Sequence, residues 1–337
     1  MPPGAIGSRQ LQRGGPLPGY FQPVEIKAPP GALVSLAEAG RFGPLRQAPI
    51  KAGLLIGQVY RIKVTNIPLR SGMEVFPTIE LIDRLSASGL TRIEAASFVH
   101  PKAVPQMADA AQVMRGIAKA PGVVYSALVP NLAGCQAALA TPVDELALFV
   151  SASQTHNRKN VNQSVEESLE GLARVAALGR EAGRRLRGYI VTAFGCPYEG
   201  LLTRRQLAAI LDAYAAMGVE EVSLGDTTGM ANPEQVARMA DWLLAGAWLM
   251  RVAFHFHDSR GLGLANVVSA YQAGIRVFDC SLGGVGGCPT AVGAAGNVDT
   301  LDLVNLFEEM GVATGLDFEG LRQAALAMEK DLPSPLP

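Results

Sequence analysis

Residues 251–282 decide the fold of this chain, and they read RVAFHFHDSRGLGLANVVSAYQAGIRVFDCSL. The run from Arg251 to His257 predicts a buried strand, because it is apolar and contains β-branched and aromatic residues. The pattern from Gly263 to Ala273 predicts a helix, and Val277 to Leu282 predicts the next strand. This strand–helix–strand succession is typical of a parallel βαβ unit.

The same alternation continues along most of the chain. Short β-branched runs predict eight strands, at residues 59–66, 92–98, 123–129, 145–151, 187–194, 220–224, 251–257 and 277–282. Helical patterns lie between them, at residues 78–88, 104–118, 162–182, 203–217, 232–245, 263–273 and 300–310. Eight evenly spaced strands that alternate with helices predict an α/β fold of the (β/α)8 TIM-barrel type. A doubly wound sheet is the structural alternative, which the even period disfavours.

The first 57 residues differ from the rest of the chain. They contain 10 Gly and 9 Pro, with six basic residues against two acidic ones. Such a density of Pro and Gly favours irregular or extended chain over helix. We therefore expect an irregular N-terminal extension over residues 1–57, with short strands around Gln22 to Ile26, and a barrel domain over residues 58–330.

Composition excludes several classes of protein. The 29 basic and 30 acidic residues leave a formal net charge of -1, so no basic field for nucleic acid is present. The sequence contains no uninterrupted run of about 18 apolar residues, which is the length that a membrane-spanning helix needs. The four cysteines form no CxxC pair and no secretory signal is evident, so we expect reduced thiols, a cytoplasmic location and no disulfide framework.

Two of the four histidines end the seventh predicted strand. His255 and His257 are two positions apart, so in a strand they share a face and the intervening Phe256 takes the other. Barrel enzymes place their chemistry at the C-terminal ends of the strands. Two imidazoles there make half of a divalent-metal site, and the alternative is a hydrogen-bonded pair of core histidines.

Other candidate residues lie at the same end of the predicted barrel. Glu94 is a carboxylate within an apolar strand, which is costly without a partner, and Arg70 on the preceding strand is a candidate partner. Cys288 lies in a glycine-rich loop, where it could act as an acid, base or nucleophile. Asn297 offers a neutral oxygen ligand, whereas Cys280 is expected to be a packing residue.

Five stretches of the chain resemble hydroxymethylglutaryl-CoA lyases in order and spacing. They are SFVHPKAVPQMAD at 97–109, GCPYEG at 195–200, SLGDT at 223–227, HFHD at 255–258 and GVGGCP at 284–289. The resemblance covers about residues 60–320. It implies a metal-dependent carbon–carbon lyase that cleaves a 3-hydroxy-3-methylglutaryl thioester to acetyl-CoA and a 3-oxo acid.

The resemblance also implies roles for individual residues. A divalent cation, Mg²⁺ or Mn²⁺, would be held by His255, His257 and Asn297. Arg70 would stabilise the developing enolate oxygen, and Glu94 would organise the site. Cys288 would help to deliver a proton. His255 would be a catalytic residue as well as a metal ligand. The remaining implied contacts, which bind the acyl-CoA substrate, are Ser223, Asp226, Lys102 and Asn131. A homodimer is the expected assembly.

The sequence departs from the family pattern at the first strand. The family has Arg-Asp-Gly-Leu-Gln where this chain reads Arg70-Ser71-Gly72-Met73-Glu74, so the metal-binding aspartate is a serine. A serine hydroxyl is a neutral, weak ligand and no general base, whereas Glu74 is a possible substitute carboxylate. His100 and His156 are histidines that the pattern leaves unassigned; each is either a surface residue or a replacement base.

Two alternatives to the lyase stay open. One is an aldolase or Claisen-type enzyme that uses the same enolate chemistry on another acyl-CoA or on a 2-oxo acid. The other is a degenerate barrel that binds an acyl-CoA or a protein partner without catalysis.

Overall fold

The computed structural model describes residues 21–26, 33–38, 41–42, 46–47, 50–55, 62–65, 75–102, 104, 107–286 and 296–331. The chain divides into two compact units, Met1–Pro77 and Thr78–Pro337. Each unit has its own sheet architecture. The predicted boundary after residue 57 therefore differs from the observed division, which comes twenty residues later.

The first unit consists of antiparallel strands. β1 (Phe21–Ile26) pairs with β5 (Ile50–Leu55) along its whole length. β2 (Leu33–Glu38) pairs with three partners, which are β3 (Arg41–Phe42), β4 (Arg46–Gln47) and β6 (Ile62–Thr65). The strand expected near Gln22 to Ile26 is present as β1. The irregular character expected for residues 1–57 does not hold for the described part of that segment, since turns rich in Gly and Pro also connect short antiparallel strands.

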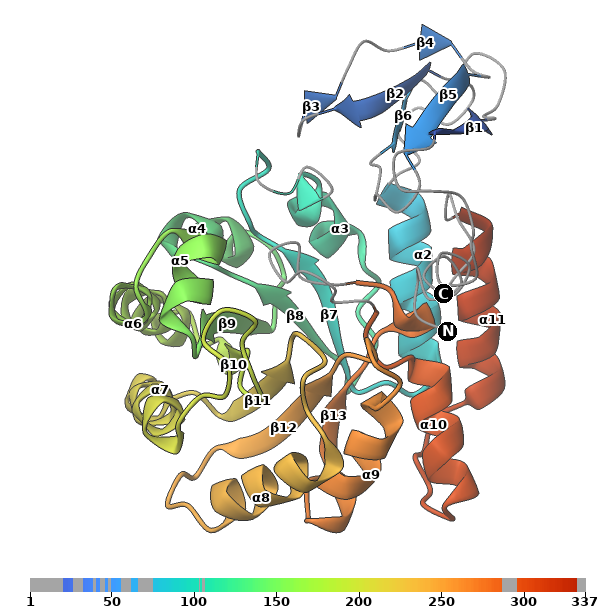
Figure 1. Ribbon diagram of the computed structural model, residues 1–337. Coiled ribbons are helices and arrows are strands. Elements are labelled where there is room, and N and C mark those ends of the chain that lie inside the picture. The colour runs from blue at the N-terminus through green and yellow to red at the C-terminus, as the bar shows by residue number, and fades with distance from the viewer. Residues whose placement is uncertain are drawn as a thin grey trace. The chain divides into compact units, whose positions relative to one another are not determined.

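The second unit is built on one parallel sheet of seven strands. They are β7 (Arg92–Ser97), β8 (Val124–Leu128), β9 (Glu145–Ser151), β10 (Arg185–Val191), β11 (Glu221–Asp226), β12 (Arg251–Phe256) and β13 (Val277–Asp279). Each strand pairs with the next one in the sequence. Figure 1 shows them as one curved fan with helices around its outer side. A doubly wound sheet reverses its strand order at a switch point, and this sheet has no reversal, so the α/β barrel class is confirmed.

Helices precede, connect and follow these strands. They are α2 (Val75–Ala87), α3 (Ala110–Gly116), α4 (Leu132–Leu139), α5 (Gln154–Val161), α6 (Val165–Glu181), α7 (Arg204–Met217), α8 (Pro233–Leu244), α9 (Gly263–Gln272), α10 (Thr300–Glu309) and α11 (Phe318–Asp331). A short 3₁₀ turn, Leu282–Gly284, follows β13. Periodicity predicted seven of the helices and missed α4, α5 and α11. No helix in the described ranges is both long and apolar enough to cross a bilayer.

The ends of several helices are fixed by local sequence. Ser164 and Glu167 form a capping box at the start of α6, and Thr203 and Gln206 form one at the start of α7. α7 ends at Gly218, whose φ of 79° lies in the left-handed region that glycine adopts without strain. The two ends of α7 thereby bound the loop that leaves β10 and the loop that enters β11.

The inner face of the sheet is unusually polar for a barrel core. Alternation along β10 turns Arg187 and Tyr189 inward, and Glu221 and Asp279 also line the interior cavity. The opposite face carries apolar side chains that pack under the helices, such as Leu186. The polar interior therefore comes from the strand sequences themselves.

One expected strand is placed differently. Residues 59–66 were expected as the first barrel strand, but β6 pairs antiparallel with β2 in the first unit. The sequence Ile62-Lys63-Val64-Thr65 alternates apolar and polar residues, which suits a sheet with one buried face. Parallel barrel strands such as β9, by contrast, are apolar almost throughout.

Candidate active site

His255 and His257 meet at the C-terminal end of β12, as the strand alternation predicted. Their ring centroids lie 5.2 Å apart and the ring planes are inclined by 68°. His257 is only 5% exposed. Both side chains line one cavity of about 1210 Å³ on the inner side of the curved sheet. The two imidazoles are thus close enough to act on a common ligand.

Both imidazoles are held in the neutral form. Burial, and then the neighbouring His255, lowers the pKa of His257 to about 4. Burial also lowers the pKa of His255, against the opposing charge of Asp279. A neutral imidazole nitrogen carries the lone pair that a metal needs. The Nδ1 atom of His257 is buried and has no hydrogen-bond partner among the described residues.

Asn297 lies beside this pair. It forms an antiparallel bridge with His257, and the backbone N–H of Val298 donates to Phe256 O at 3.1 Å. Its side-chain Nδ2 donates to Val285 O at 2.8 Å, which orients the amide, and the side chain also hydrogen-bonds His255. The segment after the glycine-rich loop is therefore fixed against the end of β12.

These three side chains fit a divalent cation that takes further ligands from outside the set. Within the described part of the chain, no three His, Cys, Asp or Glu side chains converge on a metal position, so the set is two imidazoles and an amide. The unpartnered Nδ1 of His257 is an available donor. Neutral N and O donors suit a first-row cation or Mg²⁺ completed by oxygen ligands.

A chain of hydrogen bonds crosses the interior from Glu94. Tyr189 Oη donates to Glu94 Oε2 at 2.9 Å and accepts from Arg187 Nη1 at 2.6 Å. Arg187 Nη2 donates to Asp279 Oδ1 at 2.8 Å, and Ser223 Oγ donates to Asp279 Oδ2 at 2.6 Å. Two of the predicted site residues, Glu94 and Ser223, are therefore joined through three side chains that the sequence did not single out.

Glu94 titrates near neutrality. Burial inside the barrel raises its pKa to about 7, against the hydrogen bond from Tyr189 and the charge of Arg187. Its side chain is exposed to the cavity, and the surrounding strands still desolvate the carboxyl group. A carboxyl group with this pKa can hold or release a proton at neutral pH.

Asp226 faces away from the cavity. It lies three positions after Ser223 on β11, so the two side chains take opposite faces. Its Oδ1 accepts from the backbone N–H groups of Met230 and Ala231, at 2.8 and 3.1 Å. Burial raises its pKa to about 6. Asp226 thus fixes the loop after β11, and its predicted contact with substrate stays a prediction.

Lys102 and Asn131 lie on segments that follow β7 and β8. Lys102 is exposed, and its backbone N–H donates to His100 Nδ1 at 3.1 Å. Asn131 caps α4 by accepting from Gly134 N at 2.9 Å, and it lines a second cavity of about 340 Å³. The structure does not bring either residue to the histidine pair, and their substrate contacts stay predictions.

His156 is buried, so the prediction that it is a surface residue is wrong. It is 0% exposed, and its Nδ1 lies 3.1 Å from Ser151 Oγ. Burial lowers its pKa. It lies on α5, a helix that periodicity did not predict. His100, the other unassigned histidine, is exposed.

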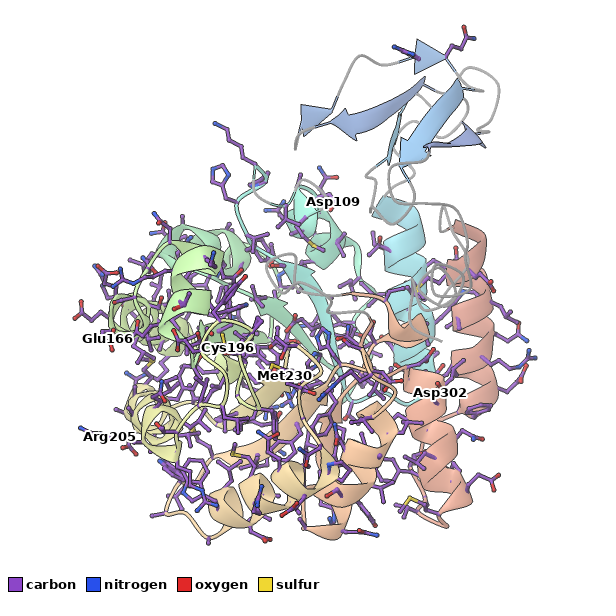
Figure 2. All side chains as sticks on the ribbon, in the orientation of Figure 1. Asp109, Glu166, Cys196, Arg205, Met230 and Asp302 are labelled. Carbon is purple, nitrogen blue, oxygen red and sulfur yellow. The ribbon has the colours of Figure 1, made fainter. Side chains whose placement is uncertain are left out.

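The cysteines differ in their surroundings. Cys280 packs against Thr300, whose Oγ1 lies 3.2 Å from the sulfur, and burial raises its pKa to about 11. Cys196 and Met230, both labelled in Figure 2, lie in the loops after β10 and β11. Cys196 Sγ lies 3.0 Å from Ser153 Oγ. The other predicted site residues lie outside the described residues; they are Arg70, Ser71, Glu74 and Cys288.

Known proteins are similar to this chain in sequence and in fold. The model of the HMGL-like family matches residues 69–327. A hydroxymethylglutaryl-CoA lyase of Bacillus subtilis is 43% identical over 82% of this chain and 95% of its own length, and a mitochondrial one of Gallus gallus is 44% identical over 77% and 90%.

Solved structures agree with these matches. An HMG-CoA lyase of Bacillus subtilis has a TM-score of 0.75 at 45% identity, covering 80% of this chain and 90% of its own. An HMG-CoA lyase of Acinetobacter baumannii in complex with coenzyme A and 3-methylmalate has a TM-score of 0.75 at 41% identity, covering 78% and 86%. The chain therefore belongs to the HMGL-like family, the family of the hydroxymethylglutaryl-CoA lyases.

Proposed function

We propose that this protein is a carbon–carbon lyase that cleaves a 3-hydroxy-3-methylglutaryl-CoA-type thioester to acetyl-CoA and a 3-oxo acid. The observation that carries the proposal is the meeting of His255, His257 and Asn297 at the mouth of a cavity that also holds Glu94. Relatives named hydroxymethylglutaryl-CoA lyase support the substrate class.

The described residues suit such a cleavage. The reaction takes a proton from the C3 hydroxyl, breaks the C2–C3 bond and returns a proton to C2. A divalent cation held by His255, His257 and Asn297, Mg²⁺ or Mn²⁺ in our proposal, would polarise substrate oxygens and lower the pKa of the hydroxyl. Glu94, with a pKa of about 7, can hold or accept a proton beside the reacting group.

Roles for residues outside the described ranges follow from the family resemblance. We propose that Arg70 steadies the enolate oxygen and that Cys288 delivers the proton to C2. Both proposals can be tested with Arg70→Met and Cys288→Ala, which should lower kcat more than they change KM, since each would act only in the transition state.

The activity test is direct. Purified protein is mixed with 3-hydroxy-3-methylglutaryl-CoA and Mg²⁺ or Mn²⁺, and acetyl-CoA is measured before and after a chelator is added. We expect formation that the chelator stops and that added metal restores. Absence of acetyl-CoA with every metal tried contradicts the proposal.

One sequence observation favours a second candidate function, binding of an acyl-CoA without cleavage. Ser71 stands where the family has an aspartate, which removes one negatively charged ligand. The variant Ser71→Asp separates the two functions. The lyase proposal expects tighter metal binding by calorimetry together with faster cleavage, whereas a non-catalytic barrel expects neither.

A further inference from the structure

Tyr189 occupies a fixed position between a buried cation and a carboxylate. Its phenol oxygen lies 2.6 Å from Arg187 Nη1 and 2.9 Å from Glu94 Oε2. Burial raises the pKa of Tyr189, so the phenol keeps its proton at physiological pH. Since the guanidinium can only donate, Tyr189 accepts from Arg187 and donates its own proton to Glu94.

Arg187 is itself held in place from two other sides. It is 2% exposed, and its Nε donates to Glu221 Oε1 at 2.7 Å while Nη2 donates to Asp279 Oδ1 at 2.8 Å. Its Cζ atom lies 4.9 Å from the centroid of the Tyr189 ring. Nη1 is therefore fixed in the direction of Tyr189, and a polarised hydroxyl is a stronger donor than an isolated one.

Groups with opposing effects on ionisation surround Glu94. On the described elements, Tyr189 and Arg187 of β10 favour its ionised form, whereas Asp279 of β13 and Glu145 of β9 oppose it. Burial opposes the ionised form most strongly and brings the pKa to about 7. With the two forms so close in free energy, one hydrogen bond is enough to decide which form is present at neutral pH.

We propose that Tyr189 is a positioning residue of the lyase site, which, polarised by Arg187, holds Glu94 toward the cavity as an ionised hydrogen-bond acceptor. This inference rests on the proposed function for its catalytic meaning, but the contact itself does not. An ionised Glu94 accepts hydrogen bonds from groups in the cavity, whereas a protonated one donates. Tyr189 thus sets the pH above which Glu94 can accept.

The test reads Glu94 directly in the metal-free protein. Infrared difference spectra between wild type and Glu94→Gln isolate the C=O stretch of the protonated Glu94 carboxyl, and its loss with rising pH gives a midpoint. Removing a hydrogen bond to the charged form in Tyr189→Phe should raise that midpoint by about one pH unit. An unchanged or lower midpoint in Tyr189→Phe overturns the inference.

The matched control is Tyr125→Phe. Tyr125 is also fully buried and bonds Ser86 Oγ and Ala120 N, but on the outer side of the sheet. Its loss should leave the Glu94 midpoint unchanged. A shift in Tyr125→Phe as large as that in Tyr189→Phe would mean that loss of any buried hydroxyl moves the midpoint, and it would overturn the inference.

A second substitution keeps the ring and its packing in case Tyr189→Phe does not fold. 3-Fluorotyrosine placed at position 189 is a more acidic phenol and a stronger donor, so it should lower the Glu94 midpoint. A midpoint that rises or stays unchanged overturns the inference by an independent route.

Catalysis supplies the last readout and separates the two claims. If the protein is a lyase, the acidic limb of its kcat/KM profile should move to higher pH in Tyr189→Phe, in step with the infrared midpoint. If the Glu94 midpoint shifts in Tyr189→Phe but the wild-type protein has no lyase activity, the proposed function is contradicted and the role of Tyr189 toward Glu94 is supported. If the wild-type protein is an active lyase but the Glu94 midpoint does not shift in Tyr189→Phe, only the role of Tyr189 toward Glu94 is contradicted.

Discussion

At the scale of single residues, Asp226 shows how burial controls ionisation. It is 1% exposed, its Oδ1 fixes two backbone N–H groups, and its Oδ2 has no hydrogen-bond partner among the described residues. Its pKa is raised to about 6, mainly by burial. The folded state therefore keeps the proton to a higher pH than the unfolded chain, and stability falls as pH rises from about 4 to about 6.

The variant Asp226→Asn should remove this pH dependence. Asparagine keeps the Oδ1 acceptor and carries no charge, so we expect the variant to gain up to about 3 kcal/mol over wild type at pH 7.5 and much less at pH 4. Urea denaturation at both pH values measures the difference. The control is Asp302→Asn, which changes an exposed carboxylate. An effect of Asp226→Asn on stability that is equal at the two pH values would contradict the account.

Glu94 makes a second prediction at this scale. Glu94→Gln is nearly isosteric but cannot exchange a proton, so kcat/KM should fall by about a hundredfold or more while the fold is retained. Steady-state kinetics beside a far-ultraviolet dichroism spectrum check both points. Activity within a few-fold of wild type would remove Glu94 from the reaction.

The residue scale also marks a limit of sequence reasoning. The spacing of His255 and His257 is enough to place them on one face, because strand alternation is a local rule. The partner of Glu94 is not local. The pairing of Glu94 with Arg70 stays a prediction, because Arg70 lies outside the described residues. The partner that the structure shows, Tyr189, lies three strands away in the sheet. Contacts across a barrel depend on the curvature of the sheet, and the periodicity of the sequence does not predict this curvature.

At the scale of elements, the contact of β10 with α7 depends on one glycine. A Cβ atom at Gly188 would lie 2.6 Å from Tyr214 Cε2. Tyr214 is fully buried and its hydroxyl donates to Tyr189 O at 3.0 Å, so the ring cannot move freely. β10 can approach α7 this closely only because position 188 has no side chain.

Gly188→Ala should therefore destabilise the protein by about 1–3 kcal/mol through overpacking. The matched control is Gly171→Ala on α6, where a Cβ would meet nothing within 4 Å. That change should stabilise the helix by up to about 1 kcal/mol. Thermal unfolding of the two variants checks the opposite signs, and destabilisation of similar size in both would refute the packing argument.

Elements were predictable where their signals are local. Periodicity located α6 and α7 to within a few residues, and the structure shows a capping box at the start of each. α5 was missed because its sequence, QTHNRKNV, is polar and lacks an apolar stripe, although its N-cap Ser153 accepts from His156 N. β6 was assigned to the wrong sheet, since a short alternating run fits either partner and only tertiary pairing decides.

At the scale of the whole molecule, one buried carboxylate joins four strands. Glu221 of β11 is 1% exposed and pairs with Arg92 of β7, Arg187 of β10 and Arg251 of β12. Paired charges inside a barrel leave uncompensated cations when one partner is lost. The order of the seven parallel strands was predictable from their regular alternation with helices, but this network was not, because its members are far apart in sequence.

Glu221→Gln should destabilise the protein by about 3–5 kcal/mol. The neighbouring pair of Glu220 with Arg185 is largely exposed, at 53% and 40%, and Glu220→Gln should cost less than about 1 kcal/mol. Chemical denaturation distinguishes the two. Equal costs would mean that the interior network contributes no more than a surface ion pair.

The central claim is that this family member cleaves the C2–C3 bond of a 3-hydroxy-3-methylglutaryl thioester. The most direct measurement quenches the reaction of purified protein with the thioester and Mn²⁺ at intervals and quantifies every product by mass spectrometry. We expect acetyl-CoA and acetoacetate in equal amounts from wild type and neither from His255→Ala. A thioester that stays intact with the wild-type protein, or equal cleavage by His255→Ala, would contradict the account.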